Sequence, residues 1–563
     1  MDDIEILKTA VKNALEHGGR ADAGAVFSKV VGSDKSMLKD IKTARALVDR
    51  LTSEVNAKTP EDIAEMADEL GVQLKTERKE TEPELKPLPN VVSGVVLRLP
   101  PEPSGYMHLG HAISFMINYL YREKYGGKLW LRFEDTNPKL IKKRDEYVES
   151  FESGLKWLGI EWDEKKFVSS DIEKIYSYGK TLIDESKAYV CLCTPEAIKT
   201  KRLSGDSCEH RDQSTQRNVE LWDAAKAGSF NDGEAVVRFK ADMKSSDFAL
   251  RDPSIFRIIK NDYKPYSLWP LYDLASVAED HLCGITHVLR SNEFKVGLQE
   301  RLRAALGFKS PEIVQYGRYN FRGTPFSKRL IRALIKDGKI ADWNDIRLPT
   351  VSALIRRGIQ PKAIRDFVLT VGYSGSKHEY TWDLLLTLNR RIIDENARRL
   401  FFVSNPVELT VENAKPLEVR LKYHPSKDLG SRIVKTDGHF FIDHKDYDNI
   451  KLDQEIRLKD LYTVRIEDKS DGRLRGKFVS DSIIGDETII QWATSASVPV
   501  RVVVLGELLK GDGTFNENSL GEISGLGEPA VGTLKKGDII QFERFGFCIL
   551  DNKADNSFVY ISR

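Results

Sequence analysis

Residues 91–138 read VVSGVVLRLPPEPSGYMHLGHAISFMINYLYREKYGGKLWLRFEDTNP, and this stretch decides the fold. The β-branched run VVSGVVLRL predicts a buried strand, and the loop PPEPSGYM after it is rich in turn residues. The next stretch, HLGHAISFMINYLYREKYGG, has Ile113, Met116, Tyr119 and Leu120 on one helical face. KLWLRF predicts a second strand. Because strand, loop, helix and strand make a βαβ unit, we expect an α/β domain with a doubly wound parallel sheet.

The segments before this unit have other patterns. Residues 1–75 predict a helical N-terminal extension, and Thr59 followed by Pro60 predicts the start of one of its helices. The first helix is predicted from apolar residues at helical spacing, namely Ile4, Leu7, Val11, Ala14 and Leu15. Residues 76–90 are charged and rich in proline, with almost nothing to bury, so we expect a linker there.

The segments after this unit change pattern twice. Strands and helices alternate to about residue 330, so the α/β domain is predicted to span residues 91–330. Residues 331–403 return to helical periodicity, which predicts a helical connecting domain. Residues 404–563 are short β-rich runs broken by Gly, Asp and Asn. They favour antiparallel barrels or a sandwich.

Composition narrows the class of protein only broadly. The chain has 563 residues, too many for one core, with 86 basic and 85 acidic side chains and a net charge of +1. That balance gives no overall attraction to nucleic acid, so any RNA binding would use local basic patches. No run of about 18 apolar residues occurs, so we expect no membrane span. The acidic start and only five cysteines favour a cytoplasmic protein without a disulfide scaffold.

The loop between the predicted strand and helix has the properties of a phosphate site. It lies at the carboxyl end of a strand, where open α/β sheets bind ligands. The start of the helix offers free N–H groups and a positive dipole end. His108 and His111, three residues apart, can reach one triphosphate, and Gly110 leaves room for a flat purine. Taken alone, H-x-G-H also fits a strand–helix turn that has two histidines without a ligand.

The complete string supports a family resemblance. HLGH resembles the HIGH signature of class I aminoacyl-tRNA synthetases, and the preceding RLPPEPSG resembles the glutamyl/glutaminyl branch in particular. The resemblance covers residues 91–563 and, more weakly, the helical N-terminus that archaeal members also have. It implies a Rossmann-like catalytic domain, an acceptor-binding insertion at about 190–250, and β-barrel anticodon-binding domains at 404–563, as in the archaeal and eukaryotic enzymes.

The resemblance also assigns the ATP site. A second signature, Ser327–Lys328–Arg329, resembles the end of the KMSKS motif, although Pro325 replaces its first lysine. The histidines would steady the phosphates and the Lys328 ammonium would neutralise the α-phosphate. The catalytic residues implied are His108, His111 and Lys328. The ATP-binding residues implied are Pro101, Ser104, Gly105, His108, Gly110, His111, Ser327, Lys328 and Arg329.

An amino-acid pocket is implied by the same resemblance. A substrate with an α-amino group and a side-chain carboxylate needs an acceptor at one end and cations at the other. Arg98 and Arg290 would grip the carboxylate together, whereas the glutaminyl enzyme has an uncharged cysteine in place of the second arginine. Taken singly, either arginine also fits a surface salt bridge. The glutamate-binding residues implied are Arg98, Glu102, Glu134, Tyr272, Ser276 and Arg290.

Three of the five cysteines and one histidine fall within a window of 20 residues. Cys191-x-Cys193 and Cys208-x-His210 make a four-ligand set that is typical of structural zinc sites, because no coordination position is left open. The pattern resembles the zinc knuckle in the acceptor-binding insertion of some glutamyl enzymes. Reduced cysteines in a strand beside a loop histidine remain the alternative.

The activity implied is that of a glutamate–tRNA ligase. Glutamate would attack the α-phosphate of ATP, with Mg²⁺ bridging the phosphates, and the tRNA ribose would take the glutamyl group. The partners implied are glutamate, ATP and the glutamate tRNA, with charging of the glutamine tRNA left open, and we expect a monomer. The alternatives are a glutaminyl enzyme, a non-catalytic tRNA-binding scaffold, which Pro325 would suit, and a nucleotidyltransferase with a similar loop.

Overall fold

The computed structural model divides the chain into two units, Met1–Glu84 and Leu85–Arg563. The structure describes residues 3–16, 19–33, 40–72, 84–261, 265–376, 378–482, 485 and 487–563. Most of the predicted linker therefore lies outside the described residues. Its last part packs, however, because Leu85 and Leu88 are buried against the core of the second unit. No helix in the described part of the chain is long and apolar enough to cross a membrane.

The first unit consists of helices. Their bounds are α1 (Asp3–Glu16), α2 (Ala23–Ser33), α3 (Ile41–Asn56) and α4 (Pro60–Glu69). The buried stripe of α1 is Ile6, Ala10, Val11 and Ala14. Ile4 is 50% exposed, so its place in the predicted stripe was wrong: the helix turns a different face to the core. Thr59 caps α4 as predicted, and its hydroxyl accepts from the Asp62 N–H at 3.2 Å.

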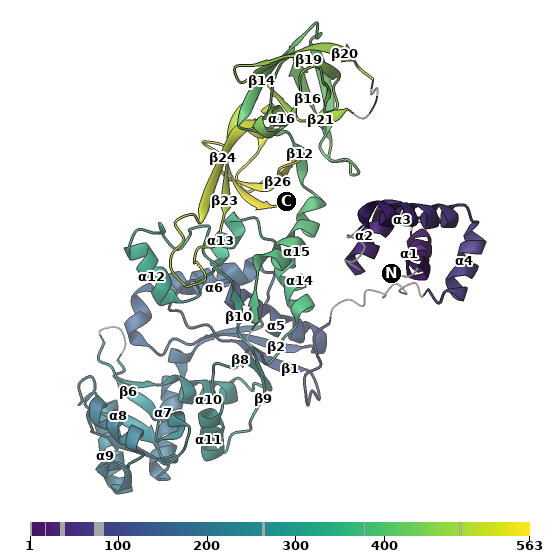
Figure 1. Ribbon diagram of the computed structural model, residues 1–563. Helices are drawn as coiled ribbons and strands as arrows, with labels where there is room; N and C mark the ends of the chain where they lie inside the picture. The colour runs from purple at the N-terminus through teal and green to yellow at the C-terminus, as the bar shows by residue number, and fades with distance from the viewer. Residues whose placement is uncertain are drawn as a thin grey trace. The chain divides into compact units, whose positions relative to one another are not determined.

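The parallel sheet predicted from residues 91–138 is present (Figure 1). Strands β1 (Val95–Leu99), β2 (Gly127–Phe133) and β3 (Glu164–Phe167) pair in parallel. A second parallel pair, β8 (His287–Ser291) and β9 (Glu312–Tyr316), adjoins β1, where the Thr286 N–H donates to the Val96 carbonyl at 3.0 Å. Val92 is 95% exposed, so the first strand begins later than predicted, after the positive φ of Gly94.

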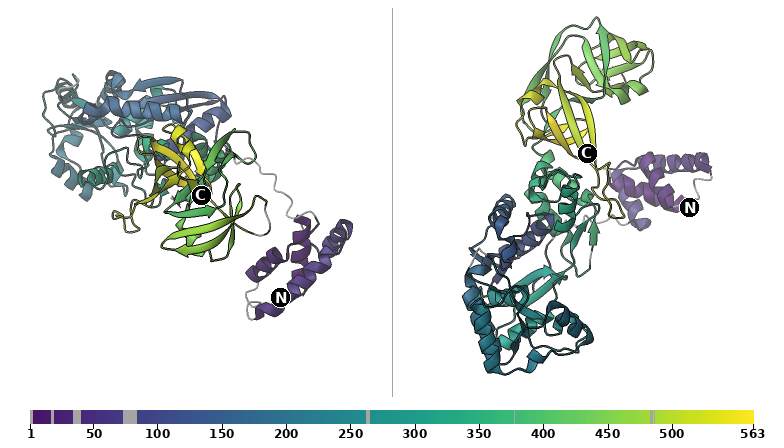
Figure 2. Two further views of the ribbon diagram at one scale, coloured as in Figure 1. Left: turned by 90° about the horizontal axis from the view of Figure 1, so that it is seen from above. Right: turned by 90° about the vertical axis from the view of Figure 1, so that its left-hand side faces the viewer.

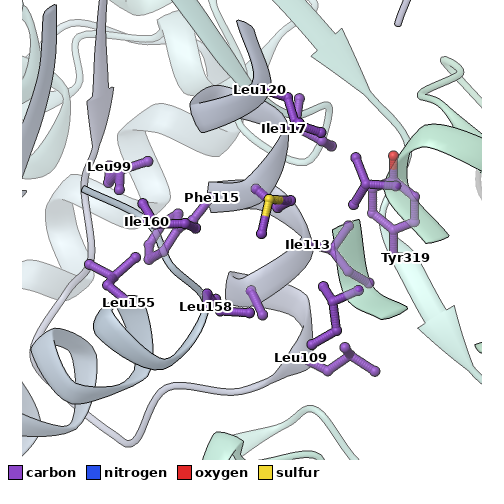
Figure 3. Close-up of a cluster of buried hydrophobic side chains, with 14 of the residues drawn as sticks. Leu99, Leu109, Ile113, Phe115, Ile117, Leu120, Leu155, Leu158, Ile160 and Tyr319 are labelled. Carbon is purple, nitrogen blue, oxygen red and sulfur yellow. The ribbon is translucent and has the colours of Figure 1, made fainter. Parts of the chain in front are cut away.

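The helix between β1 and β2 supplies much of the core (Figure 3). α5 (Leu109–Tyr125) begins at the N-cap His108 and ends at Gly126, whose φ is 67°. Ile113, Met116 and Leu120 are buried as predicted, whereas Tyr119 is only partly buried. The helix packs on side chains from the end of α6 (Arg144–Trp157) and the loop after it.

An antiparallel sheet interrupts the parallel one. Its strands are β4 (Ala188–Cys191), β5 (Val236–Phe239), β6 (Ser254–Ile258) and β7 (Leu268–Pro270), which extend past the predicted insertion of 190–250. The helices around it are α7 (Ile172–Asp184), α8 (Pro195–Ser204), α9 (Thr215–Lys226), α10 (Tyr272–Leu282) and α11 (Gly297–Leu306). Trp222, Phe256 and Trp269 are buried between this sheet and its helices.

A helical segment follows the α/β part. It comprises β10 (Tyr319–Phe321), α12 (Lys328–Lys336), α13 (Val351–Arg356), α14 (Pro361–Val371), β11 (His378–Tyr380) and α15 (Trp382–Asp394). Residues 398–403 were predicted as part of the helical segment but lie in strands β12 (Arg398–Leu400) and β13 (Phe402–Ser404). They form strands because they pair with segments distant in the sequence: β12 pairs with β25 (Ile539–Phe542), and β13 pairs with β24 (Leu520–Gly527).

The C-terminal part is all-β, as predicted (Figure 2). One sheet has the order β12-β25-β26-β27-β23-β24-β13 and the other β21-β18-β19-β20-β14-β17-β22. The bounds are β14 (Pro406–Glu412), β15 (Leu417–Lys422), β16 (Ser431–Thr436), β17 (His439–Asp443), α16 (His444–Asn449), β18 (Glu455–Leu458), β19 (Thr463–Ser470), β20 (Arg473–Ser480), β21 (Thr488–Ile490), β22 (Trp492–Thr494), β23 (Val498–Leu505), β24 (Leu520–Gly527), β25 (Ile539–Phe542), β26 (Gly546–Asn552) and β27 (Ser557–Ser562).

Backbone hydrogen bonds join the start of α5 to the segment before α13. The Leu109 N–H donates to the Pro349 carbonyl at 2.8 Å, and the Val351 N–H donates to the Met107 carbonyl at 2.9 Å. Met107 and Leu109 are fully buried. The turn that follows β1 is therefore fixed both by its own strand and helix and by the segment that precedes α13.

Candidate active site

A cleft of about 530 Å³ opens at the carboxyl ends of β1, β2, β8 and β9. This is the edge at which open parallel sheets bind ligands. The structure brings together here the predicted site residues Arg98, Pro101, Glu102, His108, Gly110, His111, Glu134, Tyr272, Arg290 and Lys328. They come from segments up to about 230 residues apart in the sequence, and the fold brings them together at this edge of the sheet.

His108 and His111 form a stacked pair at the start of α5, with ring centroids 3.8 Å apart. Each Nδ1 accepts a backbone N–H: His108 from Gly110 at 3.1 Å, and His111 from His108 at 3.3 Å. Burial, followed by the charge of Lys328, holds the pKa of His108 well below its usual value; burial and then His108 do the same for His111. Both rings are therefore neutral at pH 7, with Nε2 as the donor.

Lys328 occupies the first position of α12 and reaches back to the loop after β1. Its Nζ donates to Ser104 Oγ and lies 3.8 Å from Glu102 Oε2. The aliphatic part passes over Gly105, where a Cβ would lie 3.0 Å from the lysine chain. Burial lowers the pKa of Lys328, and the Glu102 carboxylate opposes that shift. Lys328 is thus held against the loop after β1 through the neutral hydroxyl of Ser104.

Some predicted site residues do not line the cleft. Ser104 and Gly105 lie behind the Lys328 side chain. Ser327 is exposed and caps α12, its hydroxyl accepting from the Leu330 N–H at 3.5 Å. Arg329 is exposed. Ser276 is buried inside α10, so the prediction that it contacts the amino acid does not fit its position. It follows Tyr272 by one helical turn on the same face of α10, but it lies deeper in the fold and is not among the residues that line the cleft.

A buried aspartate organises the arginines beneath the cleft. Asp280 Oδ1 accepts from Arg98 Nε at 3.2 Å and from Arg132 Nη1 at 2.9 Å, and Oδ2 accepts from Arg303 Nη2 at 2.9 Å. Burial alone would raise the pKa of Asp280, but the three guanidinium groups outweigh it and hold the pKa below its usual value. Arg98 is therefore fixed at the floor of the cleft, and its Nη1 has no hydrogen-bond partner among the described residues.

Arg132 also orients the acid at the end of β2. Its Nε and Nη2 donate to Glu134 Oε1 at 3.0 and 2.9 Å. Burial raises the pKa of Glu134, while Arg132 opposes the rise. Both bonds end on one oxygen, so Oε2 is the oxygen left to accept from a ligand.

Arg290, at the end of β8, is 5% exposed and lines the same cleft. Its Nη1 donates to Gln299 Oε1 at 3.0 Å, and Nε has no partner in the described part of the chain. Burial lowers the pKa of Arg290. Three arginines, Arg98, Arg132 and Arg303, pair directly with two carboxylates, Asp280 and Glu134, and Arg290 pairs with neither, so guanidinium groups outnumber their directly paired carboxylates here. A buried surplus of this sign favours an anionic ligand.

Several residues that organise the cleft were not predicted, namely Arg132, Gln299, Arg303 and Asp280. All four lie within helices or strands and are at most 3% exposed. A charged residue in an amphipathic helix usually faces solvent, so their letters alone gave no signal. A hint was available only for Arg132, which alternates with apolar neighbours in a strand predicted to be buried.

The predicted cysteine–histidine set is assembled at the end of β4. The ligand atoms of Cys191, Cys193, Cys208 and His210 all lie within 4.8 Å of one another. Cys191 Sγ is 3.8 Å from Cys208 Sγ, and Cys193 Sγ is 3.5 Å from His210 Nδ1. With Zn–S bonds of about 2.3 Å, a tetrahedral site has sulfur–sulfur separations of about 3.8 Å. The four side chains therefore fit a tetrahedral ion.

Known families match nearly all of the second unit. Residues 94–395 match the family described as tRNA synthetases class I (E and Q), catalytic domain. Residues 397–480 and 489–551 match two families described as tRNA synthetases class I (E and Q), anti-codon binding domain.

Curated relatives extend the likeness to the whole chain. The chain is 37% identical to a glutamate–tRNA ligase of Nitrosopumilus maritimus over 568 residues, covering 99% of both chains. It is 33% identical to that of Pyrococcus furiosus over 575 residues, or 99% of this chain and 98% of the other. A solved glutamate tRNA ligase of Elizabethkingia meningosepticum, in complex with its amino acid, has a TM-score of 0.40 at 20% identity over 54% of this chain and 70% of that one, too weak a likeness to add support. The family matches and these full-length relatives show that the chain belongs to the class I tRNA synthetases of the glutamate and glutamine (E and Q) type.

Proposed function

We propose that the chain is a glutamate–tRNA ligase, which uses ATP to attach glutamate to the 3′-terminal adenosine of a tRNA. The observation that supports this choice is the pair of buried guanidinium groups, Arg98 and Arg290, at the floor of the cleft. Each has a buried nitrogen without a partner in the described residues. A substrate carboxylate would satisfy both nitrogens, whereas a neutral amide would leave the charge unpaired.

Glutamate can be placed from these contacts. Its side-chain carboxylate accepts from Arg98 Nη1 and Arg290 Nε, and its α-ammonium donates to Glu134. The α-carboxylate then lies toward the start of α5. Asp280 holds Arg98 and Arg132 by ion pairs, and Arg132 in turn holds the Glu134 side chain. Because these side chains are in position before the substrate arrives, little reorganisation is needed.

The first chemical step is an in-line attack at the nucleotide. An α-carboxylate oxygen of glutamate forms a bond to the α-phosphorus of ATP, the bond to the β-phosphate oxygen breaks, and pyrophosphate leaves with both electrons of that bond. His108 and His111 donate from Nε2 to phosphate oxygens. The Lys328 ammonium exchanges Ser104 for the α-phosphate as negative charge builds there. Mg²⁺ bound to the triphosphate would neutralise part of its charge.

The second step uses the tRNA. Its terminal 2′-hydroxyl oxygen forms a bond to the activated carbonyl carbon, the bond from that carbon to the phosphate oxygen breaks, and AMP leaves with the bonding electrons while the hydroxyl proton passes to a phosphate oxygen. The two C-terminal β sheets, which match anti-codon binding families, are assigned to the anticodon. Phosphate contacts would position the RNA, and unstacked bases would be read by stacking and edge hydrogen bonds.

The Cys191 cluster is proposed to hold a structural zinc ion. Its four side chains supply two thiolates from the end of β4, and a third with an imidazole from the turn before residue 212, at separations that suit a tetrahedral ion. When bound, the ion would lock this turn onto the antiparallel sheet. It leaves no open position for a substrate, so it takes no part in the reaction.

The activity is tested by ATP–pyrophosphate exchange with purified protein, glutamate and tRNA. Exchange that depends on glutamate is expected, and its absence would point to a non-catalytic scaffold. Exchange with glutamine in place of glutamate would instead identify a glutaminyl enzyme. Aminoacylation with purified glutamate and glutamine tRNAs then decides whether one or both are charged.

The zinc assignment is tested by metal analysis of the purified chain. About one zinc ion per chain is expected. Cys208→Ser should lose most of it and lower the thermal midpoint. Cys548→Ser is the matched control, because that buried cysteine lies in the C-terminal sheet away from the cluster. Equal zinc content in the two variants would refute the site.

A further inference from the structure

Arg290 is held by neutral partners, unlike the other arginines of the cleft. Its Nη1 donates to Gln299 Oε1 at 3.0 Å, and its Nη2 donates to the Lys295 carbonyl at 3.5 Å. Arg98, by contrast, donates to the Asp280 carboxylate. Arg290 is therefore the guanidinium of the cleft whose positive charge no directly bonded carboxylate offsets in the described structure.

Gln299, in the first turn of α11, is 1% exposed and bridges Arg290 to a carboxylate. Its Nε2 donates to Asp273 Oδ1 at 3.1 Å. Because a guanidinium only donates and a carboxylate only accepts, these two partners fix which way the amide faces. Asp273 is therefore linked to Arg290 through the Gln299 side-chain amide and not by a direct hydrogen bond between the described side chains. A glutamate at position 299 would pair with Arg290 and repel Asp273.

We infer that Gln299 is a specificity-determining positioning residue, which orients Arg290 while leaving its charge for the side-chain carboxylate of the substrate. The inference rests on the proposed function. In the empty cleft the Arg290 charge is buried and unpaired, and burial lowers its pKa accordingly. An acidic side chain relieves that cost and a neutral amide does not. The preference for acid over amide thus depends on the neutrality of residue 299.

Three variants separate the charge of residue 299 from its packing. Gln299→Glu adds a carboxylate. Gln299→Met removes both hydrogen bonds without adding charge. The double variant Asp273→Asn with Gln299→Glu restores a bond between the two positions, because the new amide at 273 can donate to the new carboxylate at 299. Circular dichroism and thermal unfolding of each variant verify folding.

The readout is binding of two stable aminoacyl-adenylate analogues that differ only in having a glutamate or a glutamine side chain. Gln299→Glu should weaken the charged analogue about 100-fold and the neutral one less than about threefold, in both the single and the double variant. Gln299→Met should weaken both analogues about tenfold, so that their ratio stays near that of the unmodified protein.

The ratio of the two affinities decides the inference. If both variants with Gln299→Glu keep the original ratio, the neutrality of residue 299 does not set specificity. If Gln299→Met lowers the ratio as far as Gln299→Glu does, packing rather than charge is responsible, and the inference is again wrong. If the unmodified protein fails to bind the charged analogue, the proposed function itself fails, which is a different result from a changed ratio.

Discussion

The two ends of the cleft handle charge in opposite ways. At the amino-acid end, Arg98 and Arg132 carry permanent charges that the buried Asp280 fixes in place. At the nucleotide end, His108 is kept neutral, and Lys328 is held by the Ser104 hydroxyl and by a looser ion pair with Glu102 at 3.8 Å. The first end is a rigid charged lattice, by which we mean the buried ion-pair network of Arg98, Arg132, Arg303 and Asp280. The second is a set of donors whose contacts can be exchanged for those of a ligand.

This difference suggests a division of labour. A rigid lattice selects its ligand before any chemistry, because a wrong side chain leaves a buried charge unpaired. Exchangeable donors contribute most when charge develops on a transferring phosphate. Substitutions at the amino-acid end should therefore change which substrate binds, and substitutions at the nucleotide end should change how fast it reacts.

Arg290→Cys tests the amino-acid end most strongly. Glutamate-dependent ATP–pyrophosphate exchange should lose roughly 10³-fold in kcat/KM, mainly through KM, with a far smaller change for glutamine. Arg301→Cys, on the exposed side of α11, is the control and should be near normal. Retained glutamate affinity in Arg290→Cys would refute the carboxylate grip.

Asp280→Asn should destabilise the lattice by about 3 kcal/mol at pH 7, because three buried guanidinium groups lose their shared charge. The folded-state pKa of Asp280 lies below its usual value, so its contribution is present above about pH 4 and is lost as pH falls through the lowered pKa. Urea unfolding at pH 7 and pH 3 measures both effects. Asp512→Asn, in an exposed turn, is the control. An equal stability gap at the two pH values would contradict the assignment.

Lys328→Ala tests the nucleotide end. It should lower kcat roughly 100-fold while KM for glutamate changes less than about threefold. Lys336→Ala serves as the control on the same helix, since that side chain is exposed and lies in the last turn of α12. A large rise in KM with unchanged kcat would place Lys328 in ground-state binding instead.

The smallest change predicted here is one in the pH dependence of folding stability, in His108→Asn, which keeps a side-chain acceptor at the helix start. Because the folded-state pKa of His108 is lowered, the unfolded chain takes up the proton first, and stability is lost as pH falls below about 6.5. The unmodified protein should therefore lose more stability than His108→Asn between pH 6.5 and 5, by roughly 1.5 kcal/mol. Parallel pH curves for the two proteins would contradict this view of the nucleotide end.

The sequence could predict features set by local patterns, but not features that depend on contacts between residues distant in the sequence. The turn around His108 and the cysteine–histidine set are local patterns, so their letters and spacing predicted them. Asp280 and Gln299 could not be predicted, because each gains its role from side chains that are distant in the sequence. The C-terminal strands were predicted, but not their order, since register depends on pairing between distant segments.

The backbone hydrogen bonds between Leu109 and Pro349 and between Met107 and Val351 limit where the polypeptide could be truncated or joined to another. A polypeptide ending at residue 330 would keep the whole parallel sheet yet leave two buried backbone groups beside the phosphate loop unpaired, at about 1–3 kcal/mol each. Such a fragment would not form a working nucleotide pocket. A chimaera that borrows C-terminal strands from another enzyme must therefore place its junction after Val351.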